Sequence, residues 1–191
     1  MGNSVDLTSM KEKNRESLQE VIQESGGVLA EQCYQCGKCT AGCPVVFAMD
    51  STPRQIMRLL QLSMVDEALK TQTIWLCAGC QTCSVRCPRE VDIARVMESL
   101  RILARKKGYI SEKKVNLFHE LFLKSVESNG RVHEMGLILG ANVLGMQPLK
   151  DAEFGLPMMT RGKLSVMPHK IKDNGEVKKI FENVRKRGAK V

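Results

Sequence analysis

The cysteines are the residues of this 191-residue chain whose spacing indicates chemistry. All eight fall in two copies of one pattern, Cys-x2-Cys-x2-Cys-x3-Cys-Pro, which start 44 residues apart. The first copy runs from Cys33 to Pro44 and the second from Cys77 to Pro88. Three closely spaced thiolates, followed by a fourth before a proline, are typical of loops that bind [4Fe-4S] clusters. The repeat therefore predicts two such clusters.

The fourth cysteine of each copy is predicted to bind the cluster of the other copy, as in two-cluster proteins with this motif. One predicted ligand set is Cys33, Cys36, Cys39 and Cys87. The other is Cys77, Cys80, Cys83 and Cys43. Small residues in the loops let backbone amides approach the sulfurs and help to set the reduction potential. These residues are Gly37, Gly42, Ala78 and Gly79.

Other uses of the cysteines fit the pattern less well. Structural zinc sites pair two knuckles of two cysteines or histidines, and a triple run with a trailing Cys-Pro departs from that. A thioredoxin-like dithiol would need one Cys-x-x-Cys beside a βαβ unit, which is not seen. The three histidines, His119, His133 and His169, have no cysteine or histidine at ligand spacing. No nucleotide, flavin or nucleophile motif is found, so we expect no catalytic residue in this chain.

The net charge of +8 is unevenly distributed, since residues 95–191 hold 20 basic and 10 acidic residues. A basic half is one sign of nucleic-acid binding. Only 4% of the residues are aromatic, however, and the basic side chains are spread over amphipathic segments. Two clusters with four thiolates each are anionic, so the basic residues are better explained as offsetting them or binding acidic partners. We expect no nucleic-acid partner.

The segment between the two copies is predicted to be helical. Ser51 or Thr52 can cap a helix whose first residue is Pro53, and a second short helix is expected from Val65 to Lys70. Small β-type ferredoxins have a short, strand-like linker at this place. A helical linker therefore favours an all-helical ferredoxin domain.

The remaining segments are also predicted to be helical or irregular, so the fold class is mostly α. After the second copy, Asp92 is expected to cap a helix that runs to about Lys107 and is stopped by Gly108. Upstream, a helix should end at Gly26-Gly27. Downstream, the predicted elements are a helix opened by Ser111, a helical stretch at 131–146, an irregular segment at 147–171 and a last helix capped by Asp173 with Glu176.

Three regions are expected: an N-terminal helical segment (1–28), an alpha-helical ferredoxin domain with both clusters (29–110), and a helical and irregular C-terminal extension (111–191) that binds a partner. No apolar run approaches the ~20 residues that span a membrane, and no secretory signal is visible. A cytoplasmic protein without a membrane partner is expected, and eight reduced cysteines agree with that compartment.

The sequence resembles the C subunit of heterodisulfide reductase from methanogenic archaea. The resemblance rests on the string CYQCGKCTAGCP from Cys33 to Pro44, on the helical linker, and on WLCAGC from Trp75 to Cys80. It is tightest over residues 29–110, and all eight cysteines match the family pattern. The C-terminal strings RGKL and PHKIKD are similar but less specific.

The resemblance implies an electron-transfer subunit of a soluble oxidoreductase complex used in methanogenesis. In that complex, the A subunit holds flavin and bifurcates electrons, and the B subunit reduces the mixed disulfide of coenzymes M and B. Expected partners are the A and B subunits, with a hydrogenase or a formate dehydrogenase in a larger complex. A relay subunit of another oxidoreductase, of the succinate dehydrogenase, fumarate reductase or glycolate oxidase type, is the alternative.

Overall fold

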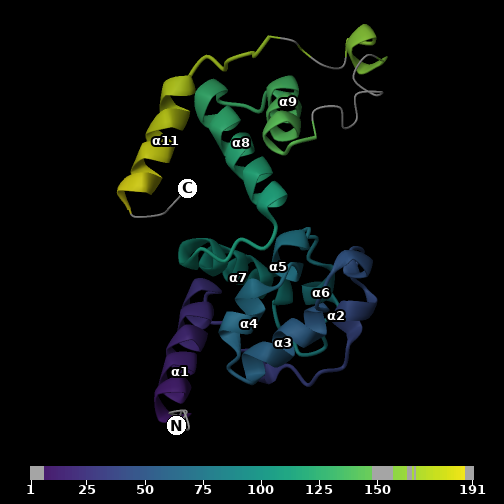
Figure 1. The fold of residues 1–191 in the computed structure, drawn as a ribbon, viewed down its shortest axis with the longest axis vertical. Helices are drawn as coiled ribbons and strands as arrows, with labels where there is room; N and C mark the ends of the chain where they lie inside the picture. Colours follow the sequence, from purple (N-terminus) through teal and green to yellow (C-terminus); the bar gives the residue numbers. More distant parts are fainter. Residues whose placement is uncertain (1–6, 148–156, 163–164, 166, 188–191) are drawn as a thin grey trace, which may run out of the picture. The chain divides into compact units, whose positions relative to one another are not determined.

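The computed structural model describes residues 7–147, 157–162, 165 and 167–187 (Figure 1). All regular structure within these ranges is helical, which confirms the predicted mostly α fold. The chain divides into two compact units, Met1–Glu112 and Lys113–Val191. None of the helices in the described ranges has the length and apolar character that crossing a membrane requires.

The first unit contains both cysteine runs. Its helices are α1 (Leu7–Glu24), η1 (Ala30–Gln32), α2 (Lys38–Ala41), η2 (Val46–Ala48), α3 (Pro53–Gln61), α4 (Val65–Lys70), α5 (Thr73–Leu76), α6 (Thr82–Val85) and α7 (Ile93–Lys107). Helix α7 packs against α1, α4, α5 and α6, and these helices surround the core (Figure 1). Large side chains such as Ile56, Leu69, Ile74 and Leu100 are fully buried there. Each contributes about 1.5–3 kcal/mol through loss of contact with water.

Helices α3 and α7 begin where the sequence predicts, and α7 also ends where predicted. Thr52 caps α3 through a capping box with Gln55, and Pro53 is its first residue. The carboxylate of Asp92 accepts a hydrogen bond from the backbone N–H of Arg95 at 3.1 Å, and so caps α7. Gly108 ends α7 with a φ of 80°, a left-handed conformation that favours glycine.

The second unit is built on α8 (Lys113–Asn129), against which α9 (Glu134–Leu144) and α11 (Asn174–Lys186) both pack. Helix α11 is tied to α8 at two points. The side-chain amide of Asn174 donates to the Ser128 carbonyl at 2.7 Å. The guanidinium of Arg185 binds both carboxylate oxygens of Glu127, at 2.8 and 2.7 Å.

Three details of the C-terminal prediction are wrong. Ser111 does not open α8, because its hydroxyl donates instead to the Lys70 carbonyl at 2.5 Å and the helix begins two residues later. Asp173 stands at the N-terminus of α11 but its side chain makes no capping hydrogen bond. One helical turn, residues 157–160, interrupts the segment predicted to be irregular, of which residues 148–156, 163–164 and 166 lie outside the described residues.

Candidate metal centres

The two cysteine runs fold into the same loop. On each side of the second cysteine, Cys36 or Cys80, stands a residue with a left-handed backbone. These residues are Gln35 (φ 65°) and Gly37 (φ 80°) in the first run and Gly79 (φ 63°) and Gln81 (φ 63°) in the second. Glutamine is uncommon in this conformation, so the loop is enforced by its surroundings rather than by glycine alone. A short helix, α2 or α6, follows each loop at the equivalent position.

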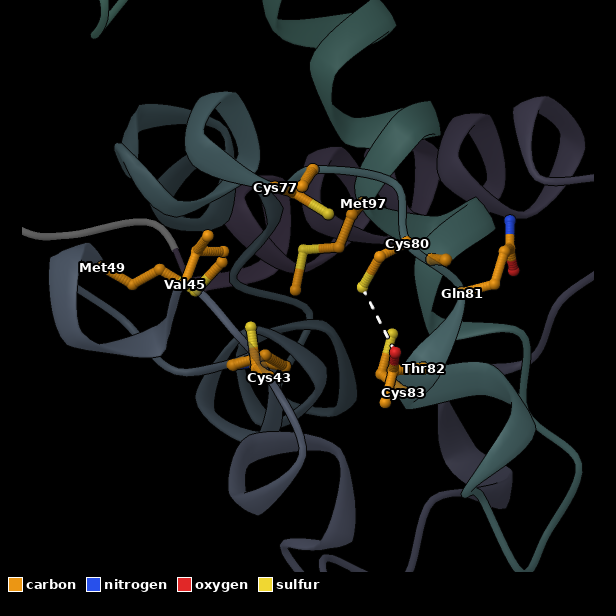
Figure 2. Close-up of a pocket in the computed structure, with 12 residues that line it drawn as sticks. Cys43, Val45, Met49, Cys77, Cys80, Gln81, Thr82, Cys83 and Met97 are labelled. Atoms are coloured by element: carbon orange, nitrogen blue, oxygen red, sulfur yellow. Dashed lines mark hydrogen bonds between the residues drawn. The ribbon is translucent and has the colours of Figure 1, made fainter.

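The sulfurs of the second run face a pocket that they share with a cysteine of the first run. Cys43, Cys77, Cys80 and Cys83 all line this pocket. Figure 2 shows the four side chains arranged around the opening, with Met97 of α7 reaching between them. The structure thus brings Cys43 to the loop of the opposite copy.

The rest of the pocket wall is largely apolar and comes from three further elements. Val45 and Met49 flank η2, Pro53 begins α3, and Ala94 and Met97 belong to α7. An apolar wall with four thiol sulfurs suits a cluster of iron and sulfide, because thiolates are the ligands that such clusters take. Among the described residues, no three Cys, His, Asp or Glu side chains come close enough together to hold a single metal ion.

The first run lies beside Cys87 of the second. Tyr34, which is exposed, has a pKa above its ordinary value. Loss of hydration is the main cause, followed by a hydrogen bond to Cys36 and by the negative charges of Cys36 and Cys87. Two residues after Cys87, the Arg89 Nε donates to the Gln32 carbonyl at 3.4 Å. Cys87 and the loop of the first copy therefore share one neighbourhood.

The second and third cysteines of each run differ in the same way in both copies. Cys36 and Cys80 are exposed, and the pKa of each thiol is lowered. The backbone N–H of Lys38 is the main cause at Cys36, and the hydroxyl of Thr82, 3.4 Å from the Cys80 sulfur, is the main cause at Cys80 (Figure 2).

The third cysteines are less accessible. Burial raises the pKa of the Cys39 thiol, and the charge of Cys33 adds to this. Burial likewise raises the pKa of Cys83 to about 11, with a further contribution from Cys77. A metal bound at either site must displace a tightly held proton, because thiol ligands bind as thiolates.

The two copies meet where α2 packs against α6. Gly42 and Arg86, which occupy the same position in their respective copies, touch there. A Cβ added at Gly42 would lie 2.5 Å from the Arg86 Nη1 atom, so a larger residue there would require this exposed side chain to move. Ser84 of α6 joins the next element, because its hydroxyl donates to Asp92 at 2.7 Å and accepts the N–H of Ala94 at 3.0 Å.

Comparison with known proteins identifies the domain and the family. The family model described as a 4Fe-4S dicluster domain matches residues 29–91. The chain is 42% identical over 101 residues to the iron-sulfur C subunit of CoB–CoM heterodisulfide reductase from Methanopyrus kandleri, which is 53% of this chain and 53% of that protein. It is 33% identical over 143 residues to the C 2 iron-sulfur subunit of the same reductase from Methanocaldococcus jannaschii, which is 70% of this chain and 76% of that protein.

The chain belongs to the family of heterodisulfide reductase C subunits. A further member, the C subunit of the H2:CoB–CoM heterodisulfide, ferredoxin reductase from Methanothermobacter marburgensis, is 38% identical over 92 residues, which is 48% of this chain and 50% of that protein. The match thus spans about half the length of the Methanopyrus and Methanothermobacter relatives. It confirms the resemblance inferred from the cysteine strings.

In this member of the C-subunit family, the ligand assignment itself stays a prediction. The pocket groups Cys43 with Cys77, Cys80 and Cys83, and the surroundings of Tyr34 bring Cys87 to the first run. Sequence reasoning missed the side chains that hold these loops from outside, namely Gln61, Asp50, Thr73 and Arg101. None belongs to a recognised motif, and only the fold brings them to the cysteines.

Proposed function

We propose that the chain is the electron-relay subunit of a heterodisulfide reductase complex. In this proposal it holds two [4Fe-4S] clusters between a flavin-bearing A subunit and a B subunit that reduces the heterodisulfide of coenzymes M and B. The names of two relatives include H2 and formate, which supports a hydrogenase or a formate dehydrogenase as the ultimate electron donor.

The observation that carries the proposal is the pocket that Cys43 shares with Cys77, Cys80 and Cys83. Such a grouping is what a ligand set drawn from both copies requires. If the fourth cysteine of each copy binds the cluster of the other copy, then Cys33, Cys36, Cys39 and Cys87 form the other ligand set. A bound [4Fe-4S] cluster supplies one-electron transfer.

The residues around the sites have complementary roles in the proposal. The less accessible third cysteines, buried Cys39 and half-buried Cys83, anchor the sites on their inner side. The exposed second cysteines, Cys36 and Cys80, leave each site one edge close to solvent, where a redox partner can approach. All eight cysteines are assigned as ligands, so no thiol remains to attack a disulfide. Disulfide reduction is therefore assigned to the B subunit.

Metal and sulfide analysis tests the cofactor content directly. The chain purified without oxygen, or reconstituted with iron and sulfide, should contain about eight iron atoms and about eight acid-labile sulfides. A broad visible absorption should bleach when a low-potential dye is added. Saturation at about four iron atoms, or a colourless protein containing zinc, would refute the two-cluster assignment.

An assay of the isolated chain tests the relay role. Reduced by a low-potential dye, it should store electrons but leave the heterodisulfide of coenzymes M and B intact until the B subunit is added. Steady reduction of the heterodisulfide by this chain alone, at a rate comparable with that of the complex, would refute the relay role.

A further inference from the structure

The two cysteine loops are held from outside by two different side chains in equivalent places. The Gln61 Nε2 of α3 donates to the carbonyls of Ala30 and Cys33, at 3.1 and 2.5 Å. In the second copy, Arg101 of α7 donates to the carbonyls of Ile74 at 2.8 Å (Nε) and Cys77 at 2.6 Å (Nη2). Ile74 and Cys77 stand 44 residues after Ala30 and Cys33, the same offset as the cysteine repeat. The Gln61 carboxamide and the Arg101 guanidinium thus bind equivalent backbone carbonyls in the two copies.

The equivalence shows that binding these carbonyls does not require a positive charge. Glutamine suffices in the first copy, where Gln35 supports it by donating to the Gln61 Oε1 at 3.3 Å. The second copy has Gly79 at the place of Gln35, and the longer arginine reaches the carbonyls unaided. The hydrogen bonds to the carbonyls do not need a charged donor. Arg101 therefore also supplies a fixed positive charge beside the loop of Cys77.

This charge is better placed to act than the other basic side chains near the sites. Arg101 is half-buried and clamped by two carbonyls, and no ion pair in the described part of the chain involves it. The other cations near the loops are exposed to solvent and are screened by water and salt. They are Lys38, Arg54, Arg58, Arg86 and Arg89. Among them Arg58 donates a hydrogen bond to the Gln61 Oε1 atom at 3.3 Å.

We propose that Arg101 raises the reduction potential of the cluster held by Cys77, Cys80, Cys83 and Cys43 above that of the cluster held by Cys33, Cys36, Cys39 and Cys87. The inference rests on the proposed function, because it assumes a cluster at each site. Reduction adds one electron to a cluster and neither makes nor breaks a bond, so a fixed cation favours the reduced form. The electron then resides on the Cys77 side, and Arg101 and Gln61 make the two sites unequal.

The size of the effect follows from Coulomb's law. A fixed unit charge several ångströms from a redox centre, in a medium of intermediate dielectric constant, changes the reduction equilibrium on the order of tenfold. For a one-electron centre, a tenfold change in the ratio of reduced to oxidised cluster corresponds to about 59 mV.

The test exchanges the two side chains in the full-length chain with both clusters present. Arg101→Gln gives the second copy the side chain of the first, Gln61→Arg does the reverse, and Arg101→Lys keeps the charge while changing the hydrogen bonds. The two potentials are measured by redox titration with low-temperature electron paramagnetic resonance. Cys36→Ser and Cys80→Ser identify which signal belongs to which site.

Arg101→Gln should lower the reduction potential of the cluster bound by Cys77, Cys80, Cys83 and Cys43 by about 59 mV. The reduction potential of the other cluster should change by only a fraction of that amount. Arg101→Lys should reverse most of the decrease, and Gln61→Arg should raise the potential on the Cys33 side. Equal shifts of both potentials, no shift, or a lysine variant that behaves like the glutamine variant would overturn the inference. If Arg101→Gln loses iron, Gln61→Arg decides alone. Absence of two clusters from the unmodified chain would refute the proposed function instead.

Discussion

Removal of the Asp50 carboxylate should destabilise the first unit, because this side chain joins the end of the first cysteine copy to the start of the helix that leads into the second. The carboxylate accepts hydrogen bonds from the N–H groups of Gln72 and Thr73, at 2.9 and 3.0 Å, and from the Thr73 hydroxyl at 2.7 Å. Partial burial acts to raise the pKa of Asp50, but these hydrogen bonds outweigh it and the pKa lies below its ordinary value.

Three hydrogen bonds to a charged acceptor are worth more than neutral ones, but Asp50 is exposed and water weakens each of them. At about 1 kcal/mol each, Asp50→Ala should cost about 2–3 kcal/mol of unfolding free energy. For a unit of this size that is a fall of about 10 °C in the melting temperature. Circular dichroism during heating without oxygen, with visible absorbance recorded together, measures the loss of helix and of clusters at once.

The pH dependence gives an independent check. A lowered native pKa contributes stability above the unfolded pKa and loses it only as the pH falls through the native value. The difference between the unmodified chain and Asp50→Ala should therefore be constant from about pH 6 to 8. Glu67→Ala is the control, since Glu67 makes an exposed ion pair with Lys70 at 3.3 Å. A melting shift no larger than that of Glu67→Ala, or one that varies across this range, would refute the reasoning.

Two further predictions concern ligation and packing. Cys87→Ser should change the electron paramagnetic resonance signal of the cluster bound by the first run, and Cys43→Ser should change the signal of the cluster bound by the second run. If each substitution changes only the cluster of its own run, the fourth cysteine binds locally. Gly130→Ala should destabilise the second unit by about 2 kcal/mol more than Gly162→Ala in thermal unfolding. Both glycines have positive φ, but a Cβ at Gly130 would overlap the Ile171 side chain, whereas no atom of the described residues lies within 4 Å of a Cβ at Gly162. Equal losses of unfolding free energy in the two variants would show that the Ile171 side chain moves aside at little cost.

The sequence was sufficient for the elements whose signals are local. A cap at Ser51 or Thr52, the proline that begins α3, the Asp92 cap and the stop at Gly108 each depend on residues within one helical turn, and all are found, with Thr52 as the cap of α3. The cysteine spacing was equally informative, because the ligand pattern of an iron-sulfur loop is itself local. Ser111 shows the limit of this reasoning: it has the right side chain to cap α8, but tertiary contact with Lys70 takes its hydroxyl elsewhere.

The residues that support the loops could not be predicted in this way, because their contacts join segments far apart in the chain. Asp50 reaches Thr73, Gln61 reaches Cys33, and Arg101 reaches Cys77. An internal repeat predicts two equal sites, and the alignment of the cysteines contains nothing that contradicts it. Gln61 and Arg101 lie outside the repeat and are not separated by its 44-residue offset, so sequence comparison of the two copies passes over them. The unequal potentials proposed for the two clusters therefore come from the helices that hold the loops, α3 with Gln61 and α7 with Arg101, rather than from the loops themselves.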